Sequence, residues 1–406
     1  MTEFRMVEAY CVKCRAKWEI KDPKCVTMKN GQPAVKGTCP KCGAGMYRIG
    51  KLDSPNNINE HPQKPENQGI PYSIDDIIKE GCFLEKSELE TMIYILKTKK
   101  NLILQGPPGT GKTWLAKKLA HAFIGYKPQE SGFEVRAVQF HPNLSYEDFV
   151  RGWRPVNNEG QSSLELVDGP FLKMIEDAKD YQDESNNKFV MVIEEINRGN
   201  PASIFGEMLT LLEADKRNPD EALILSYPRV DDYDYDVDDV VAENVIDDDY
   251  DDEDYDVDED YDDENELVYI PENMYVIGTM NVADRSIAMM DLALRRRFGF
   301  YNLKPIFNKA WKDWVHDQWG IDIKTLDDIG KRLEELNHTI EQDTLLGPHF
   351  KVGHSYVTPN YEVDNPKEWF KQIVHSDIGP LLDEYWVEDP KKAKSEKDKL
   401  LRGFDS

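Results

Sequence analysis

The hydrophobic residues of this 406-residue chain gather in short apolar runs that are separated by longer mixed stretches. Four runs are short and apolar enough to predict buried strands, at residues 101–105, 135–140, 189–193 and 274–279. A helical pattern between two of them covers residues 203–214. Strands that alternate with helices favour an α/β fold in which helices cover both faces of a parallel sheet.

Composition divides the chain into parts. Residues 1–51 contain short alternating segments with turn signals, which predict a small module of hairpins. Residues 52–72 hold four prolines among Asn, Gln and Glu, so we expect an extended linker there. From residue 73 the composition becomes globular, and we expect the core domain to cover residues 73–300.

Charge is distributed unevenly along the chain. The net charge is −27, but residues 231–266 hold 22 Asp or Glu and no Lys or Arg, so the rest of the chain carries −5. Residues 1–51 carry +7. Because so many like charges repel, we expect a disordered loop or an extended hairpin tip at residues 231–266. Its role stays open between a solvated insertion, a docking site for basic partners and a nucleic-acid mimic, with calcium binding less favoured.

Neither a membrane span nor the apolar core of a signal peptide is found in the sequence. We therefore expect a cytoplasmic protein without membrane contacts. In that compartment the six cysteines are not expected to form disulfides.

Four of the cysteines form two pairs with metal-ligand spacing. Cys11 and Cys14 make one Cys-x-x-Cys unit, Cys39 and Cys42 make the other, and 24 residues lie between them. Two such units suit one tetrahedral Zn²⁺, with redox-active or unrelated cysteines as the alternative. Because so small a module buries little surface, the metal is expected to supply about 10 kcal/mol of folding free energy.

The segment from Tyr10 to Gly50 resembles a small zinc-ribbon family that is also found fused to topoisomerase-type proteins. The resemblance includes residues 26–31 and 36–40. It implies a module that contacts nucleic acid, DNA or RNA, or protein, and it implies no catalysis.

The most specific motif follows the first predicted strand. Residues 106–113 fit the phosphate-loop pattern G-x-x-x-x-G-K-[ST], and a helical apolar pattern comes next. A strand, a glycine loop and a helix start direct several N–H groups at one point, which favours an anion over the alternative of a chance glycine turn. Lys112 is expected to reach the terminal phosphates and Thr113 to bind Mg²⁺. The predicted nucleotide-binding residues are Gly106, Pro107, Pro108, Gly109, Thr110, Gly111, Lys112 and Thr113.

Further polar residues follow the later strands. Glu194 stands where a Mg²⁺-coordinating acid belongs, and Glu195 where the water-polarising acid belongs, with a helix N-cap as the alternative. The last predicted strand leads to Asn281, whose amide is expected to position the attacking water at the carboxyl edge of the sheet. Three arginines at residues 295–297 either cap their own helix or reach the γ-phosphate of a neighbouring subunit.

These motifs together resemble the AAA+ NTPases of McrB-type modification-dependent restriction systems, over roughly residues 73–390. The most specific stretch is residues 280–286, Met-Asn-Val-Ala-Asp-Arg-Ser, close to the family signature Met-Asn-Thr-Ala-Asp-Arg. The other matching stretches are residues 104–113, 139–141, 145–149, 195–198, 293–298 and 353–356. The resemblance implies a P-loop AAA+ parallel sheet with flanking helices, followed by a helical lid and tail over residues 301–406.

The resemblance also implies roles for individual residues. Asn281 and Asp284 match the signature residues that place the hydrolytic water, and Arg285 matches the signature arginine near the subunit interface. Arg296 and Arg297 match the interface arginines, one of which is the finger that acts in trans.

For the whole protein, the resemblance implies a hexameric ring that hydrolyses ATP or GTP with Mg²⁺, and often a separate nuclease subunit that stimulates hydrolysis. It also implies an N-terminal module that selects the target, here the zinc ribbon. The sequence therefore favours an NTPase motor of a nucleic-acid-processing or defence complex. The alternative is a nucleotide-gated scaffold or chaperone-like remodeller that turns over poorly.

Overall fold

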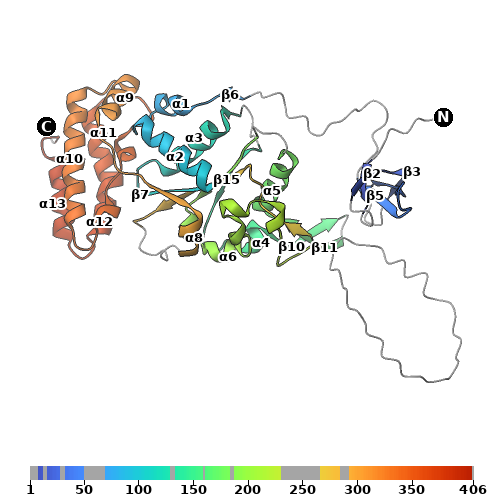
Figure 1. Cartoon of the computed structure of the whole chain (residues 1–406). Coiled ribbons are helices and arrows are strands. Elements are labelled where there is room, and N and C mark those ends of the chain that lie inside the picture. Colours follow the sequence, from blue (N-terminus) through green and yellow to red (C-terminus); the bar gives the residue numbers. More distant parts are fainter. Residues whose placement is uncertain are drawn as a thin grey trace, which may run out of the picture. The chain divides into compact units, whose positions relative to one another are not determined.

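Figure 1 shows the computed structural model of the chain. It describes residues 8–11, 16–27, 33–49, 69–128, 133–158, 161–182, 187–229, 266–283 and 292–404, and it divides into two compact units, Met1–Gln68 and Gly69–Ser406. Cys14, Asp284, Arg285 and residues 230–265 lie outside the described residues. Among the residues that are described, no helix combines the length and the apolar character needed to cross a membrane.

The first unit consists of antiparallel strands. β1 (Glu8–Cys11) pairs with β2 (Ala16–Glu19), and β3 (Lys21–Thr27), β4 (Pro33–Thr38) and β5 (Gly45–Ile49) form a three-stranded sheet. The predicted hairpins are therefore confirmed. The buried cluster of this unit is small and contains Ile20, Val35, Cys39 and Met46.

The second unit is built on a five-stranded sheet in which all neighbouring strands are parallel. In spatial order the strands are β16 (Gly299–Asn302), β7 (Asn101–Gly106), β15 (Met274–Asn281), β12 (Phe189–Glu194) and β9 (Val135–Gln139). Four of them match predicted strands, and the parallel sheet is confirmed. The fifth, β16, continues the sheet past residue 300, where we expected the core to end.

Helices cover both faces of this sheet (Figure 1). They are α1 (Ile74–Lys79), α2 (Lys86–Lys99), α3 (Lys112–Ile124), α5 (Pro170–Asp180), α6 (Pro201–Phe205) and α7 (Met208–Leu211). Leu102 and Leu104 of β7 share a buried cluster with α1, α2 and α3, whereas Ile103 between them shares one with α5, α6 and α7. Because successive side chains of a strand point to opposite faces, one apolar run supplies both layers of the core.

The helix predicted over residues 203–214 is wrong as a single element. The structure has α6 and α7 there, followed by the 3₁₀ turn η2 (Ala214–Lys216). Gly206 separates the two helices with a φ of 53°, and a Cβ atom at this position would lie 2.8 Å from the Tyr146 ring. The helix ends at this point because glycine alone accommodates both the left-handed backbone and the neighbouring ring.

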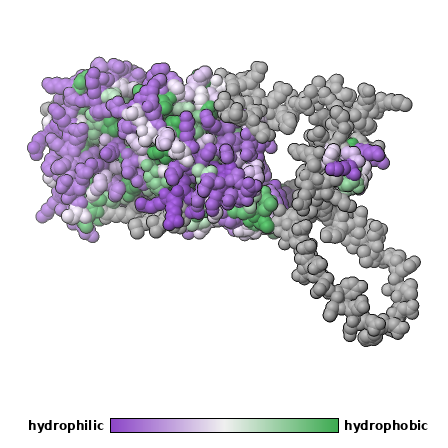
Figure 2. Space-filling view, viewed as in Figure 1, coloured by the Kyte–Doolittle hydropathy of each residue, from purple (hydrophilic) through white to green (hydrophobic). Residues whose placement is uncertain are grey.

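A long hairpin of β10 (Arg151–Asn158) and β11 (Gln161–Asp168) follows α4 (Tyr146–Phe149). Arg151 is 1% exposed and pairs with Asp168 and Glu266 at the base of this hairpin. Two short antiparallel pairs complete the strands, β6 (Ile70–Pro71) with β8 (Tyr126–Lys127) and β13 (Leu223–Ile224) with β14 (Leu267–Val268). Figure 2 shows that hydrophilic residues dominate the visible face of the second unit.

The C-terminal part forms a layer of helices, coloured orange and red in Figure 1. Its elements are α9 (Lys309–Trp319), α10 (Ile323–Gln342), η5 (Pro348–Phe350), η6 (His354–Val357), α11 (Pro366–Ile373), η7 (Val374–Ile378), α12 (Gly379–Tyr385) and α13 (Pro390–Leu401). These helices enclose a buried cluster of their own around Trp311 and Phe370. The helical lid that the resemblance implied is therefore confirmed.

Candidate active site

Three neighbouring parallel strands end at one edge of the sheet. β7 ends at Gly106, β12 at Glu194 and β15 at Asn281. Asn281 pairs with Gly106 in the sheet register, and the Val282 N–H donates to the Gly106 carbonyl at 3.4 Å. The phosphate loop, the first acid and the amide predicted from the sequence therefore meet at the carboxyl edge, where open α/β sheets bind ligands.

The phosphate loop connects β7 to α3 in a geometry suited to an anion. Gly109 and Gly111 both have a φ of 75°, in the left-handed region that favours glycine, and Gly111 is the N-cap of α3. The Thr110 hydroxyl donates to the Pro107 carbonyl at 2.9 Å, which closes the loop. The predicted residues 106–113 thus form one turn that ends in a helix N-terminus, an arrangement that binds phosphates in many proteins.

Lys112 lies inside this loop. It is 8% exposed, and its ammonium donates to the carbonyls of Gly106 at 3.0 Å and Pro107 at 2.7 Å. Burial lowers the pKa of Lys112 to about 8, although the Glu195 carboxylate acts in the opposite direction. A buried ammonium that is held by neutral carbonyls attracts an anion strongly, because little solvent screens its charge.

Glu194 lies beside the helix that carries Thr113. Its Oε1 atom is 2.6 Å from Nζ of Lys117, and Lys117 stands one helical turn after Thr113 on the same face of α3. Thr113 and Glu194, the two residues predicted to bind Mg²⁺, are therefore both on the side of Lys117 on α3. Hard oxygen ligands of this kind suit Mg²⁺, so the two side chains fit the ion.

Glu195 has an unusual backbone conformation, with φ 53° and ψ 47°. Its N–H donates to the Thr279 hydroxyl at 3.1 Å. Its Oε2 atom is buried and has no hydrogen-bond partner among the described residues, although Nε of Arg198 lies 3.6 Å away. Left-handed backbone at a non-glycine residue costs about 1–3 kcal/mol and is common at functional sites. A strained residue with an unsatisfied carboxylate oxygen indicates a group that acts on a ligand.

A second amide lies beside Asn281. Asn197, in the 3₁₀ turn η1 (Ile196–Arg198), donates from Nδ2 to the Asn281 carbonyl at 3.1 Å, and Asn281 Oδ1 accepts the Ala283 N–H at 3.3 Å. The buried Oδ1 atom of Asn197 has no hydrogen-bond partner within the described part of the chain. This oxygen and Oε2 of Glu195 are two acceptors suited to hold a water molecule.

The structure distinguishes the two arginines expected at a subunit interface. Arg297 ends α8 (Leu292–Arg297), and its Nη2 atom is 2.9 Å from Oε1 of Glu213. The carbonyl of Arg297 also accepts a hydrogen bond from Asn101 at 2.8 Å. Arg296 is exposed. Of the two, Arg296 is therefore the one that faces solvent, whereas Arg297 is bound within its own subunit.

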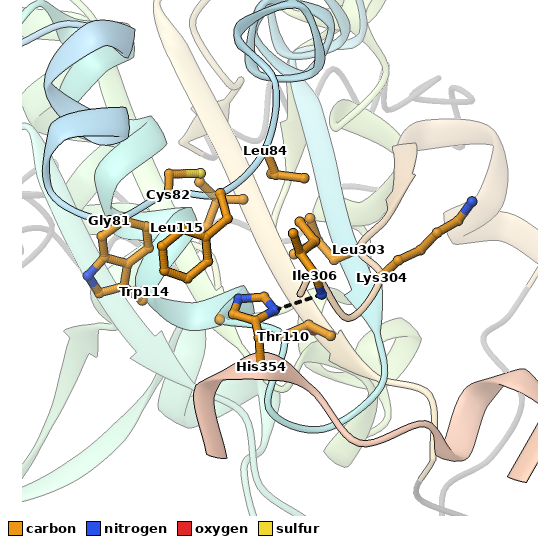
Figure 3. A pocket seen from close by; sticks show the side chains of 12 residues that line it. Gly81, Cys82, Leu84, Thr110, Trp114, Leu115, Leu303, Lys304, Ile306 and His354 are labelled. Atoms are coloured by element: carbon orange, nitrogen blue, oxygen red, sulfur yellow. Dashed lines mark hydrogen bonds between the residues drawn. The ribbon is translucent and has the colours of Figure 1, made fainter. Parts of the chain in front are cut away.

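A small pocket with a volume of about 40 Å³ adjoins the phosphate loop (Figure 3). The pocket is lined by Thr110 of the phosphate loop, Trp114 of α3, Phe83 of the segment before α2 and His354 of the lid. Sequence reasoning missed this pocket because segments far apart in the chain enclose it. The only signal was the motif at residues 353–356.

The cysteine pairs of the first unit are described only in part. Cys39 is 2% exposed, Cys42 is exposed, and the Gly43 N–H donates to the Cys39 carbonyl at 2.9 Å in a tight turn. Cys11 ends β1, and Cys14 lies outside the described residues. Within the described ranges, no three His, Cys, Asp or Glu side chains lie close enough together to hold a metal ion. The zinc site stays a prediction.

Three family models match parts of the chain. Residues 101–298 match the AAA domain (dynein-related subfamily). Residues 328–394 match the McrB alpha-helical lid domain, which corresponds to the helical layer described above. Residues 10–49 match a domain of unknown function, DUF5679.

The Type IV methyl-directed restriction enzyme EcoKMcrB subunit of Escherichia coli (strain K12) is 35% identical over 341 residues, which are 83% of this chain and 64% of that protein. The Type II restriction enzyme BsuMI component YdiS of Bacillus subtilis (strain 168) is 26% identical over 66% of this chain and 76% of that protein. The solved structure of C. elegans PCH-2 covers 90% of this chain and 87% of that chain, with 13% identity and a TM-score of 0.32. This chain thus spans just under two thirds of the first relative, at 64% of its length. The chain thus carries a match to the AAA domain followed by a match to the McrB lid domain, and it is similar to the McrB subunit over most of its length.

Proposed function

We propose that this protein is an NTPase motor that hydrolyses ATP or GTP to the diphosphate and phosphate. The observation that carries the proposal is the arrangement of the buried Lys112 and the partly buried Glu195 at one sheet edge. The Lys112 ammonium is held in the phosphate loop, and Glu195 affects its pKa while keeping one carboxylate oxygen without a hydrogen bond in the described part of the chain. A triphosphate and a water molecule satisfy these two groups at once.

In this proposal the phosphate loop and Lys112 bind the triphosphate, and Thr113 and Glu194 hold Mg²⁺. When bound, the ion neutralises negative charge that develops on the phosphate oxygens. The ion pair between Lys117 and Glu194 keeps the Glu194 carboxylate beside α3. The additional methylene of glutamate, relative to the aspartate common at this position, is compatible with contact to the ion directly or through a water molecule.

Glu195 acts as the base that polarises the attacking water. Asn281 and Asn197 are amides at the same edge, linked by the hydrogen bond between the Asn197 side chain and the Asn281 carbonyl. We assign Asn281 the role of orienting the water, together with Asp284, as the family signature implies. Asn197 adds a buried amide oxygen that has no hydrogen-bond partner within the described residues.

The first prediction concerns Lys112 and Glu195. Steady-state phosphate release with Mg²⁺ and ATP or GTP is expected to fall at least about tenfold in Lys112→Ala, which removes the phosphate-binding cation, and in Glu195→Gln, which removes the base. Lys331→Ala and Glu334→Gln on the exposed face of α10 are the matched controls and should keep the wild-type rate.

Equal rates in wild type and in both site variants would contradict the proposed hydrolysis. Tight nucleotide binding with negligible turnover in the assembled wild-type protein would instead support the second function, a nucleotide-gated scaffold or chaperone-like remodeller.

We further propose that the protein works as a homo-oligomeric ring, a hexamer, in which Arg296 reaches the γ-phosphate bound by the neighbouring subunit. Its exposure at the end of α8 supports this role, whereas the ion pair between Arg297 and Glu213 supports a role in fixing the helix. We place Arg285 near the same interface, as the family signature implies. An arginine that acts in trans is typically worth a factor of about 10³–10⁵ in rate.

A mixing experiment tests the shared site. Arg296→Ala alone and Glu195→Gln alone should each lose most of the phosphate release. When the two variants are mixed, some interfaces combine an intact Glu195 with an intact Arg296 from the neighbour, so a substantial part of the activity should return. Absence of rescue in mixed assemblies, whose size is checked by light scattering, would show that Arg296 does not act across the interface.

The relatives are named as parts of restriction enzymes. We therefore propose that the motor serves a restriction or defence complex in the cytoplasm, with a separate nuclease subunit as partner. The first unit is proposed to hold Zn²⁺ through Cys11, Cys14, Cys39 and Cys42. Its charge of +7 favours salt-sensitive contact with DNA or RNA.

Zinc content tests this part of the proposal. The purified full-length protein is expected to contain about one Zn²⁺ per chain by elemental analysis, because the four thiolates complete one tetrahedral site. The double variant with Cys39→Ser and Cys42→Ser should lose the metal, and Cys82→Ala, a cysteine of the second unit, should retain it. If the wild-type protein holds no zinc after metal-free purification followed by zinc addition, the proposed zinc site is wrong.

A further inference from the structure

The helix that carries Arg296 ends beside the first residue of β7. That residue, Asn101, is fully buried, and its Nδ2 atom donates to the carbonyl of Arg297, the last residue of α8, at 2.8 Å. The same Nδ2 atom donates to the carbonyl of Leu212, at the end of α7, at 2.7 Å. One amide group therefore uses both of its hydrogen atoms to hold the ends of two helices that are far apart in the sequence.

A buried arginine fixes the direction of this amide. Arg217 is 1% exposed, and its Nη2 atom donates to Oδ1 of Asn101 at 2.6 Å. Its guanidinium also donates to the carbonyl of Leu212, at 3.2 Å from Nη2, and to the carbonyl of Met274, at 2.5 Å from Nη1. Because a guanidinium has only donors, the amide atom that faces it is the oxygen. The Nδ2 atom of Asn101 therefore has to face the two helix ends.

Packing and charge also hold α8 within its own subunit. Leu294 and Phe298 are buried in the cluster that β12 shares with α5, α6 and α7, and the Phe298 N–H donates to the Leu294 carbonyl at 3.0 Å. The side chain of Arg297 pairs with Glu213 at 2.9 Å. Arg296 is exposed between these anchored residues. Its backbone is therefore fixed while its side chain faces solvent.

The place of α8 in the sheet determines which nucleotide Arg296 can reach. β16 follows α8 directly and runs parallel to β7, with Gly299 opposite Leu102. The end of α8 thus lies at the amino edge of the sheet. The phosphate loop begins at Gly106, at the carboxyl edge, about 16 Å further along β7. Arg296 therefore starts from the edge opposite its own phosphate loop, which favours action on the nucleotide of a neighbouring subunit.

We infer that Asn101 and Arg217 are positioning residues for the arginine finger: the amide of Asn101, oriented by Arg217, fixes the end of α8 and so sets where Arg296 enters the neighbouring site. The inference rests on the proposed function, because it takes Arg296 to act in trans. β7 then serves two sites, since it begins with the residue that places the finger and ends at the loop that binds the phosphates. A misplacement of about 1 Å at a reacting centre can lower the rate about a hundredfold.

The variant Asn101→Asp tests the inference. Aspartate keeps the shape of the side chain and the acceptor for Arg217, but it offers no donor to the carbonyl of Arg297, which its charge repels. Phosphate release by the variant alone is expected to fall about ten- to a hundredfold, because the finger is displaced. Nucleotide affinity by calorimetry and assembly size by light scattering should stay those of the wild type.

Mixed assemblies distinguish a misplaced finger from other damage. Mixed with Glu195→Gln, which supplies an intact finger, Asn101→Asp should recover a substantial part of the phosphate release, because its own phosphate loop and base are intact. Mixed with Arg296→Ala, it should recover nothing, because neither subunit then supplies a working finger. Damage to the phosphate loop of the variant would give the opposite pattern.

Two further variants complete the experiment. Arg217→Lys keeps the buried charge but cannot bind Asn101 and both carbonyls at once, so it should show the same pattern of rescue. It decides the matter if Asn101→Asp does not assemble. Asn273→Asp is the matched control, because Asn273 donates to the Ala178 carbonyl in α5 at 2.8 Å, and α5 carries no residue of the proposed interface. This control should keep the wild-type rate.

The opposite pattern of rescue, rescue by neither partner, or wild-type activity in both positioning variants overturns the inference. A different result would refute the proposed shared site itself. If Arg296→Ala and Glu195→Gln fail to restore activity to each other, no finger acts in trans, and the inference falls with that proposal. The two failures are therefore distinguishable.

Discussion

Parallel pairing of β7, β15 and β12 is the constraint on which the whole site depends. Because the strands run in the same direction and in register, the turn after β7, the acids after β12 and the amide that ends β15 arrive at one edge of the sheet. The apolar strand residues lock that register by filling the clusters on both faces. A slip of one residue would exchange the two faces and move the polar strand ends apart.

The polar groups at this edge are held in an electrostatically unsatisfied state. Lys112 is buried against carbonyl groups, and burial opposes its charge. Glu195 is fixed in a strained conformation by Thr279, and one of its carboxylate oxygens has no hydrogen bond among the described residues, although Arg198 lies 3.6 Å away. Such costs persist only where the surrounding packing enforces them. A triphosphate with its ion and a water molecule would relieve both, which explains why binding and hydrolysis suit the same fold.

The sequence predicted the parts of the fold and site that local chemistry determines. Strand periodicity located four strands, and the fixed spacing of glycines with Lys112 located the loop. Tertiary contacts decided the rest. A helix ends at Gly206 because the Tyr146 ring lies beside it. Arg297 forms an ion pair with Glu213, which is distant in the sequence. His354 lies beside the phosphate loop although the two are far apart in the sequence, so no local pattern predicts this contact.

The central claim is that a purine triphosphate binds at the buried Lys112, and calorimetry with Mg²⁺ and ATP or GTP tests it most directly. Titrations at pH 8 in two buffers of different ionisation enthalpy measure binding and proton exchange together. Because burial lowers the pKa of Lys112 to about 8 and the triphosphate favours the charged form, binding at this pH should be accompanied by proton uptake. Absence of binding heat with either nucleotide in both buffers, or binding without proton uptake, would contradict the account.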